Sequence, residues 1–254
     1  MTTFERLMKV RQERGAGYLV LLDPDRLDHS VLPSFVREAT EAGVDGFLVG
    51  GSLMLKHDLD RQLQQIKENT SVPVVIFPGS LLQVSSVADA ILFLILISGR
   101  NPEHLIGNQV IAAPIIRQIR LESISTGYML IEAGNTTSAE FMSNTKPIPR
   151  DKPDIALAHA LAAEMIGMRL LYLDAGSGAH ESVPEEMLTA ISGACRLPLI
   201  VGGGIRTPED ANRKVKSGAS FVVTGTVTEI NSHRSFIKEL ADAVHTGPAV
   251  RQRS

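Results

Sequence analysis

Two glycine-rich segments in the last quarter of the chain have the residue types of an anion-binding site. Gly202–Gly204 follows one short apolar run, and Thr224–Thr226 follows the next. Because glycine has no Cβ, the backbone there can approach a ligand closely and present its N–H groups to a phosphate. We interpret these two loops together as a phosphate site, because barrel phosphate sites are commonly built from the loops after the last two strands. The alternative is that the glycines only form tight turns.

Two oxygen-bearing side chains follow apolar runs near the start of the chain. Asp23 comes directly after the first run, and Ser52 comes after the second. Hard oxygen ligands beside a phosphate suggest Mg²⁺, which needs only one or two carboxylates when substrate phosphates complete its coordination. We expect Asp23 to be a metal ligand, with Ser52 adding a hydroxyl or a water contact. Asp25 could be a second ligand or could cap the following helix.

A third segment, Tyr172–Gly178, places a carboxylate beside glycines that allow a tight loop. The carboxylate of Asp174 could orient a polyol or accept a hydroxyl proton. It could instead be a buried acid that fixes the loop. Glu132 could act in the same way, or it could be a structural partner of Arg100 or Lys146.

All these residues stand directly after short apolar runs, which we expect to be buried strands. The runs are Tyr18–Leu22, Gly46–Val49, Pro73–Phe77, Ala90–Ile97, Ser125–Ile131, Leu170–Leu173, Pro198–Val201 and Phe221–Val223. Amphipathic stretches separate them: Val31–Ala42, Leu55–Glu68, Ala156–Gly167, Pro184–Cys195 and Pro208–Ser217. Alternating strands and helices predict a parallel sheet. The active sites of parallel barrels lie where the strands end.

The 254 residues are close to the roughly 250 of one eight-stranded barrel. We therefore predict an α/β fold, a single (β/α)8 TIM barrel over residues 1–254, with an N-terminal helix at 1–14 and a frayed tail at 247–254. Only about 12 residues, Pro78 to Asp89, separate the third and fourth strands, which is barely a minimal crossover. The third outer helix should be shortened or missing. The long, polar segment from Gly134 to Pro153 should be functional or mobile.

Composition narrows the class of protein. Hydrophobic residues make up 44% of the chain, which is enough for a large core, and the net charge of −3 does not favour a nucleic-acid partner. The single cysteine, Cys195, fits a reducing cytoplasm, so we expect a cytoplasmic protein. The longest apolar run, Ala90–Ile97, is far shorter than the roughly 20 residues of a membrane span, so we expect no transmembrane segment.

With these motifs at these strand ends, the chain resembles the geranylgeranylglyceryl phosphate synthase family, which also includes a bacterial heptaprenylglyceryl phosphate synthase. The resemblance covers about residues 15 to 230. Its motifs are Leu22–Asp25, Val49–Ser52, Phe77–Ser80, Arg100–Pro102, Tyr172–Gly178, Gly202–Arg206 and Thr224–Thr226.

The resemblance implies a barrel with a disrupted third helix that joins sn-glycerol 1-phosphate to a polyprenyl diphosphate, most simply geranylgeranyl diphosphate, and releases diphosphate with Mg²⁺. It places the metal ligands on Asp23 and Ser52. It places the glycerol-phosphate contacts on Tyr172, Leu173, Asp174, Ala175, Gly176, Ser177, Gly178, Gly203, Gly204, Gly225 and Thr226. The catalytic candidates are Asp174, where the family usually has Glu, and less strongly Glu132. Barrels of this kind usually associate, so we also expect a homo-oligomer.

Two rival hypotheses stay open at this stage. One is a sugar-phosphate isomerase or lyase, because the same phosphate site occurs in many barrels. It predicts no apolar groove and no metal requirement. The other is a phosphate- or lipid-binding protein without catalytic activity, for which Asp174 is the only support.

Overall fold

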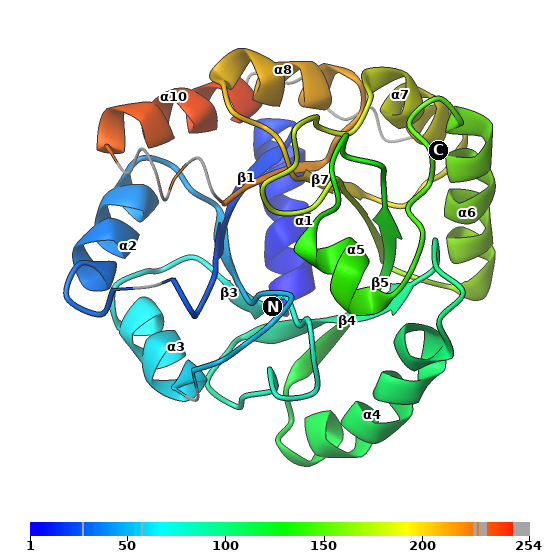
Figure 1. Cartoon of the computed structure of the whole chain (residues 1–254). Coiled ribbons are helices and arrows are strands. Elements are labelled where there is room, and N and C mark those ends of the chain that lie inside the picture. The colour runs from blue at the N-terminus through cyan, green and yellow to red at the C-terminus, as the bar shows by residue number, and fades with distance from the viewer. Residues whose placement is uncertain (27, 57, 226–227, 229–232, 246–254) are drawn as a thin grey trace.

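The computed structural model describes residues 1–26, 28–56, 58–225, 228 and 233–245. Eight parallel strands close into a barrel in chain order, with β8 pairing back onto β1 (Figure 1). The strands are β1 (Gly17–Leu22), β2 (Gly46–Val49), β3 (Val74–Ile76), β4 (Ala90–Leu96), β5 (Glu122–Leu130), β6 (Leu170–Asp174), β7 (Leu199–Gly202) and β8 (Phe221–Thr224). The predicted fold class is confirmed.

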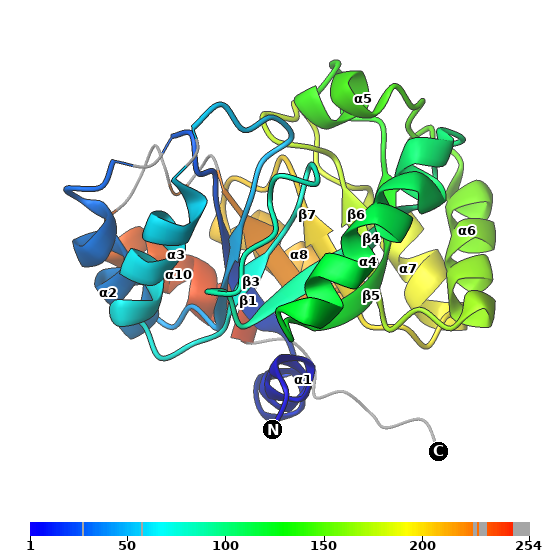
Figure 2. The same cartoon turned by 90° about the horizontal axis from the view of Figure 1, so that it is seen from below.

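Helices surround the barrel and cover its outer surface (Figure 1). They are α2 (Leu32–Glu41), α3 (Leu59–Glu68), a π-helical turn at Glu103–Gly107 that leads into α4 (Asn108–Gln118), α6 (Pro153–Ile166), α7 (Glu185–Ala194), α8 (Pro208–Lys216) and α10 (Arg234–His245). The short helix α5 (Ser138–Ser143) instead lies over the carboxyl end of the barrel (Figures 1 and 2). Pro153 and Pro208 each occupy the first turn of their helix, where a missing N–H does no harm. No described helix combines the length and apolar character that a membrane crossing requires.

The helical ring is interrupted between β3 and β4. Residues 77–89 contain turns and bends but no helix, as their short spacing predicted. In Figure 1 only loops occupy the space between α3 and α4. The outward face of β4 is therefore covered by less protein than the other strands.

Strand side chains alternate between two buried layers, as the two-residue period of a strand requires. Leu92, Ile124 and Ile200 belong to a cluster inside the barrel, and Ile91 and Leu173 belong to the larger cluster that the strands form with the helices. This alternation fixes which strand-end residues face the barrel mouth.

Helix α1 (Thr3–Arg14) closes the amino-terminal end of the barrel, beneath the strands in Figure 2. Leu7 packs within the interior cluster. The carboxylate of Glu122 accepts hydrogen bonds from the amides of Thr3 and Phe4 at 2.6 and 3.1 Å, and so holds the first turn of α1. This leaves the opposite end of the barrel for a ligand.

Several predicted boundaries differ from the structure. Strand β5 begins at Glu122 rather than Ser125, because the Glu122 carboxylate also binds the first amides of α1. Helix α3 begins at Leu59 rather than Leu55, because the Asp25 carboxylate binds the amides of Leu55 and Lys56 and holds them in a loop. The long segment from Gly134 to Pro153 includes α5, whose first turn is capped by the Thr137 hydroxyl.

Candidate active site

A cavity of about 540 Å³ opens at the carboxyl ends of the strands. Several residues expected to contact ligands line it: Asp23, Ser52, Asp174, Ser177 and Gly225. They come from the segments that end β1, β2, β6 and β8. The structure therefore brings together the metal candidates and part of the glycerol-phosphate candidates around one cavity.

Asp174 is the most completely fixed polar group of the cavity. Its side chain is only 6% exposed; one carboxylate oxygen accepts from the Gly176 amide at 2.7 Å and the other from the Tyr128 hydroxyl at 2.8 Å. Burial raises the pKa of Asp174, while the hydrogen bonds from Gly176 and Tyr128 act in the opposite direction. A carboxylate with a raised pKa is a better proton acceptor near neutral pH.

Tyr128 was missed by the sequence analysis. Burial, with the negative charge of Asp174, raises the pKa of the Tyr128 phenol well above its ordinary value, so the hydroxyl remains a donor to that carboxylate. Tyr128 lies on β5 directly opposite Tyr172 in the β5–β6 register. The signal that could have found it is the strand alternation that points Tyr128 toward the barrel mouth beside the predicted acid.

Other predicted residues of β6 and its loop lie away from the cavity surface. Tyr172 is 1% exposed and stacks on Phe77 with ring centroids 4.8 Å apart, below Asp174 in the barrel. The side chains of Leu173 and Ala175 belong to the outer layer with the helices. A ligand would meet Leu173 and Ala175 through the backbone alone.

The loops after β6 and β7 are pressed together. The Ala175 amide donates to the Gly202 carbonyl at 3.1 Å. Gly203 has a φ of +82°, and a Cβ on it would lie 2.6 Å from the Gly176 nitrogen. Gly176, Gly178 and Gly204 also have positive φ values, at +90°, +74° and +70°. Glycine adopts this backbone path without strain, so the backbone conformation explains these glycines independently of any ligand. Thr226 lies outside the described residues.

Asp23 and Ser52 lie on the other side of the cavity. One oxygen of Asp23 accepts from the Asp25 amide at 3.0 Å, and the other is 3.4 Å from Nε of Arg26. The buried side chain of Gln83 donates to the Gly51 carbonyl at 2.7 Å and accepts from the Gly79 amide at 3.1 Å. Gln83 thus holds the loop that carries Ser52 beside the loop after β3, a role that the sequence did not reveal.

The donors on this side suit Mg²⁺ only together with a phosphate ligand. Asp23 and Ser52 offer hard oxygens, but the carboxylate of Asp25 is occupied by backbone amides. Across the described ranges, no group of three or more His, Cys, Asp or Glu residues could hold a metal. Mg²⁺ often binds one or two carboxylates and completes its shell with substrate phosphates and water, and this donor set is compatible with that mode.

Glu132 does not line the cavity described above. Its side chain is exposed, and its carbonyl accepts from the Arg150 guanidinium at 3.1 Å. Its carboxylate accepts from the Arg150 amide at 3.4 Å, so Arg150, rather than Arg100 or Lys146, is the partner of this side chain. The geometry favours Asp174 over Glu132 as the group nearest to a bound hydroxyl.

The rest of the cavity is an apolar groove that runs outward through the interrupted part of the helical ring. Its apolar side chains come from β4, α4 and the segment after β3: Phe77, Leu81, Val84, Ile91, Phe93, Ala112 and Ile116 are among them. Ile91 and Phe93 face outward from β4 and line the groove; Ile91 is buried, and Phe93 is partly exposed because no helix covers it there. The groove can accommodate a long hydrocarbon chain with its polar end at the barrel mouth.

Fold and site together define a (β/α)8 barrel that combines a polar mouth with an apolar groove. A model of the PcrB family matches residues 8–244, and the chain belongs to this family. The chain is 46% identical over 241 residues to a geranylgeranylglyceryl phosphate synthase of Chitinophaga pinensis, covering 94% of this chain and 95% of that protein. It is 44% identical to the enzyme of the same name from Methanothermobacter thermautotrophicus, covering 84% and 86%.

A solved structure shows the same architecture. The geranylgeranylglyceryl phosphate synthase of Thermoplasma acidophilum, crystallised in complex with sn-glycerol-1-phosphate, is 34% identical to this chain. It superposes with a TM-score of 0.91 over 96% of this chain and 99% of that one. The resemblance stated from the motifs is confirmed.

Proposed function

We propose that this protein joins sn-glycerol 1-phosphate to a polyprenyl diphosphate, in the first place geranylgeranyl diphosphate, and releases diphosphate. The observation that carries the proposal is the single cavity that contains Asp174 and Ser177 at one end and an apolar groove at the other. The names of the relatives and the glycerol phosphate in the Thermoplasma structure support the same reaction. A sugar-phosphate isomerase or lyase has no need of such a groove.

In the reaction, a glycerol hydroxyl oxygen forms a bond to the first prenyl carbon while the bond from that carbon to the diphosphate oxygen breaks. Asp174 is held at the barrel mouth by Tyr128 and Gly176, so it is placed to orient the hydroxyl and to take its proton. The apolar groove holds the prenyl chain and excludes water that would compete for the allylic carbon. Much of the acceleration comes from the fixed proximity of the two substrates.

We further propose Asp23 and Ser52 as the protein ligands of a Mg²⁺ ion. When bound, the metal would neutralise the charge that develops on the departing diphosphate. The position of Asp23 and Ser52, on the side of the cavity away from Ser177, supports a separate place for the second phosphate-bearing substrate. A cytoplasmic location and a homo-oligomeric assembly stay as predictions.

Product analysis tests the reaction. The protein is incubated with sn-glycerol 1-phosphate, Mg²⁺ and prenyl diphosphates of several lengths, and ether products and diphosphate are measured. We expect an ether product with geranylgeranyl diphosphate, loss of turnover with EDTA, and recovery with added Mg²⁺. Absence of an ether product at every prenyl length would exclude the reaction, and undiminished turnover in EDTA would exclude the metal.

A further inference from the structure

The loop between β6 and α7, residues 175–184, has little regular structure of its own. It carries Ser177, which lines the cavity, and two glycines with positive φ, Gly176 and Gly178. Four of its carbonyl groups, at residues 179, 180, 182 and 183, accept hydrogen bonds from cationic side chains. The conformation of this loop therefore depends on side chains outside it.

Arg206 binds two consecutive carbonyls of the loop. Its guanidinium donates to the Ala179 carbonyl at 2.8 Å and to the His180 carbonyl at 3.1 Å. The planar guanidinium presents its N–H groups in a rigid fork that matches two neighbouring carbonyls, a geometry that the single, flexible nitrogen of a lysine does not reproduce. Arg206 stands two residues after Gly204, and its donors reach across to the neighbouring loop.

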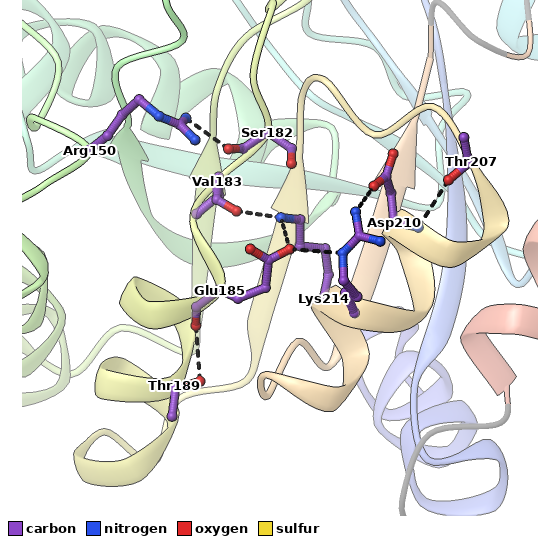
Figure 3. Close-up of polar contacts among 9 residues, drawn as sticks. Arg150, Ser182, Val183, Glu185, Thr189, Thr207, Asp210 and Lys214 are labelled. Carbon is purple, nitrogen blue, oxygen red and sulfur yellow. Dashed lines mark hydrogen bonds and ion pairs between the residues drawn. The ribbon is translucent and has the colours of Figure 1, made fainter.

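Lys214 binds the end of the same loop (Figure 3). It is only 2% exposed, and its ammonium donates to the Val183 carbonyl at 2.6 Å and to the Glu185 carboxylate at 2.8 Å. Arg150, also shown in Figure 3, donates to the Ser182 carbonyl at 2.8 Å. A buried ammonium is stable only when its donors are satisfied. Lys214 therefore favours one position of the loop end.

Arg206 and Lys214 both come from the segment that runs from β7 through α8. This segment begins with Gly202–Gly204, the second glycine-rich loop of the candidate phosphate site. The two side chains thus connect the loop after β7 with the loop after β6, in addition to the direct packing of Gly203 on Gly176.

We propose that Arg206 and Lys214 are positioning residues that hold loop 175–184 against the β7–α8 segment and so place Ser177 and Gly178 for binding the phosphate of sn-glycerol 1-phosphate. This inference rests on the proposed function. Neither side chain touches the phosphate; each acts through the carbonyls that it binds.

The test compares Arg206→Lys, Lys214→Met and the control Arg213→Met. Arg213 is another cation of α8, and it pairs with the carboxylates of Asp210 and Glu185. For the first two variants we expect KM for sn-glycerol 1-phosphate to rise about tenfold, the ratio that the loss of roughly one charged hydrogen bond produces. KM for the prenyl diphosphate and kcat at saturating glycerol phosphate should change by less than about twofold. Arg213→Met should resemble the wild type.

Amide hydrogen exchange gives an independent readout. In both variants, amides of residues 176–183 should exchange faster while those of the barrel strands keep their protection. The proposal is overturned if Arg206→Lys keeps the wild-type KM for sn-glycerol 1-phosphate. A positive charge alone would then be sufficient, and the geometry of the guanidinium would not matter. The proposal is equally overturned if both KM values rise together or if the strands also lose protection, because the defect would then be general. The wild type is measured first by calorimetry, and if it fails to bind sn-glycerol 1-phosphate, the proposed function fails instead.

Discussion

The two sides of the barrel mouth are built in opposite ways. On the side of β6 and β7, glycine loops touch one another so closely that a Cβ on Gly203 would lie 2.6 Å from a backbone nitrogen. On the side of β3 and β4, residues 77–89 form no helix, and side chains such as Ile91 and Ala112 line an open groove. One side is defined by its backbone, and the other by apolar side chains and an omitted helix.

This difference corresponds to two kinds of ligand. A small phosphate is recognised by backbone groups in fixed positions, which requires a rigid loop. A hydrocarbon chain is held by apolar area and needs space more than precise geometry. Substitutions on the two sides should therefore affect different substrates, and four experiments examine this separation.

The largest effect is expected at Asp174, at the end of β6. Asp174→Asn keeps the size of the side chain but removes the proton acceptor, so kcat should fall about 10² to 10⁴-fold. Binding of sn-glycerol 1-phosphate, measured by calorimetry, should change far less. In Glu132→Gln we expect kcat to change by less than about threefold. If Glu132→Gln were the more damaging variant, the catalytic roles would have to be exchanged.

Gly203→Ala tests the rigid side. A left-handed φ and the short distance to Gly176 should together reduce the free energy of unfolding by about 3 kcal/mol, which chemical denaturation can measure. Gly193→Ala is the matched control, because Gly193 lies in α7 and a Cβ there meets nothing within 4 Å. Alanine at that helical position should stabilise the protein by about 0.5–1 kcal/mol. If both variants changed the free energy of unfolding equally, the claim that close backbone packing defines the side of β6 and β7 would be contradicted.

Ala112→Phe tests the open side. The larger side chain would fill the groove beside α4, so turnover of geranylgeranyl diphosphate should fall about tenfold to a hundredfold while a shorter geranyl diphosphate is still accepted. Val110→Phe places the same side chain on α4 at a position that is 63% exposed, and both substrates should react as in the wild type. A uniform loss with every chain length would show that the groove does not hold the prenyl chain.

The smallest effect is a shift in pH dependence. The Tyr128 hydroxyl stabilises the charged form of Asp174, so Tyr128→Phe should raise the pKa of that carboxyl further above its ordinary value. If ionised Asp174 accepts the proton, activity falls as the pH drops through this pKa. The acidic limb of the kcat profile should then lie at higher pH in Tyr128→Phe than in the wild type. An unchanged acidic limb of the kcat profile would show that Asp174 does not accept the proton.

Much of the fold could be predicted because parallel strands buried on both faces give continuous apolar runs. Gly46–Val49 was located to the residue, and the missing helix followed from the short spacing between two such runs. The start of α3 could not be predicted, because it is set by a contact between Asp25 and the amides of Leu55 and Lys56. Contacts of this kind join residues far apart in the sequence and leave no periodic signal.

The lining of the cavity was predictable at strand ends, where Asp23 and Asp174 both reach the cavity, while their roles stay predictions. Residues that act through another residue were missed. Tyr128 sits within a strand, and Gln83 lies in a loop that has no motif, yet both orient the groups that line the cavity. Arg206 is a further case, since its contacts with the carbonyls of the neighbouring loop leave no signal in the sequence.

The separation of the two sides is tested most directly by a crystal structure of the protein with sn-glycerol 1-phosphate and a non-reactive thio analogue of geranylgeranyl diphosphate. We predict the glycerol phosphate beside Ser177 and Gly203, the diphosphate beside Asp23, and the prenyl chain along Phe93 and Ala112. A prenyl chain that leaves the barrel elsewhere, or a diphosphate in the glycine loops, would contradict this account.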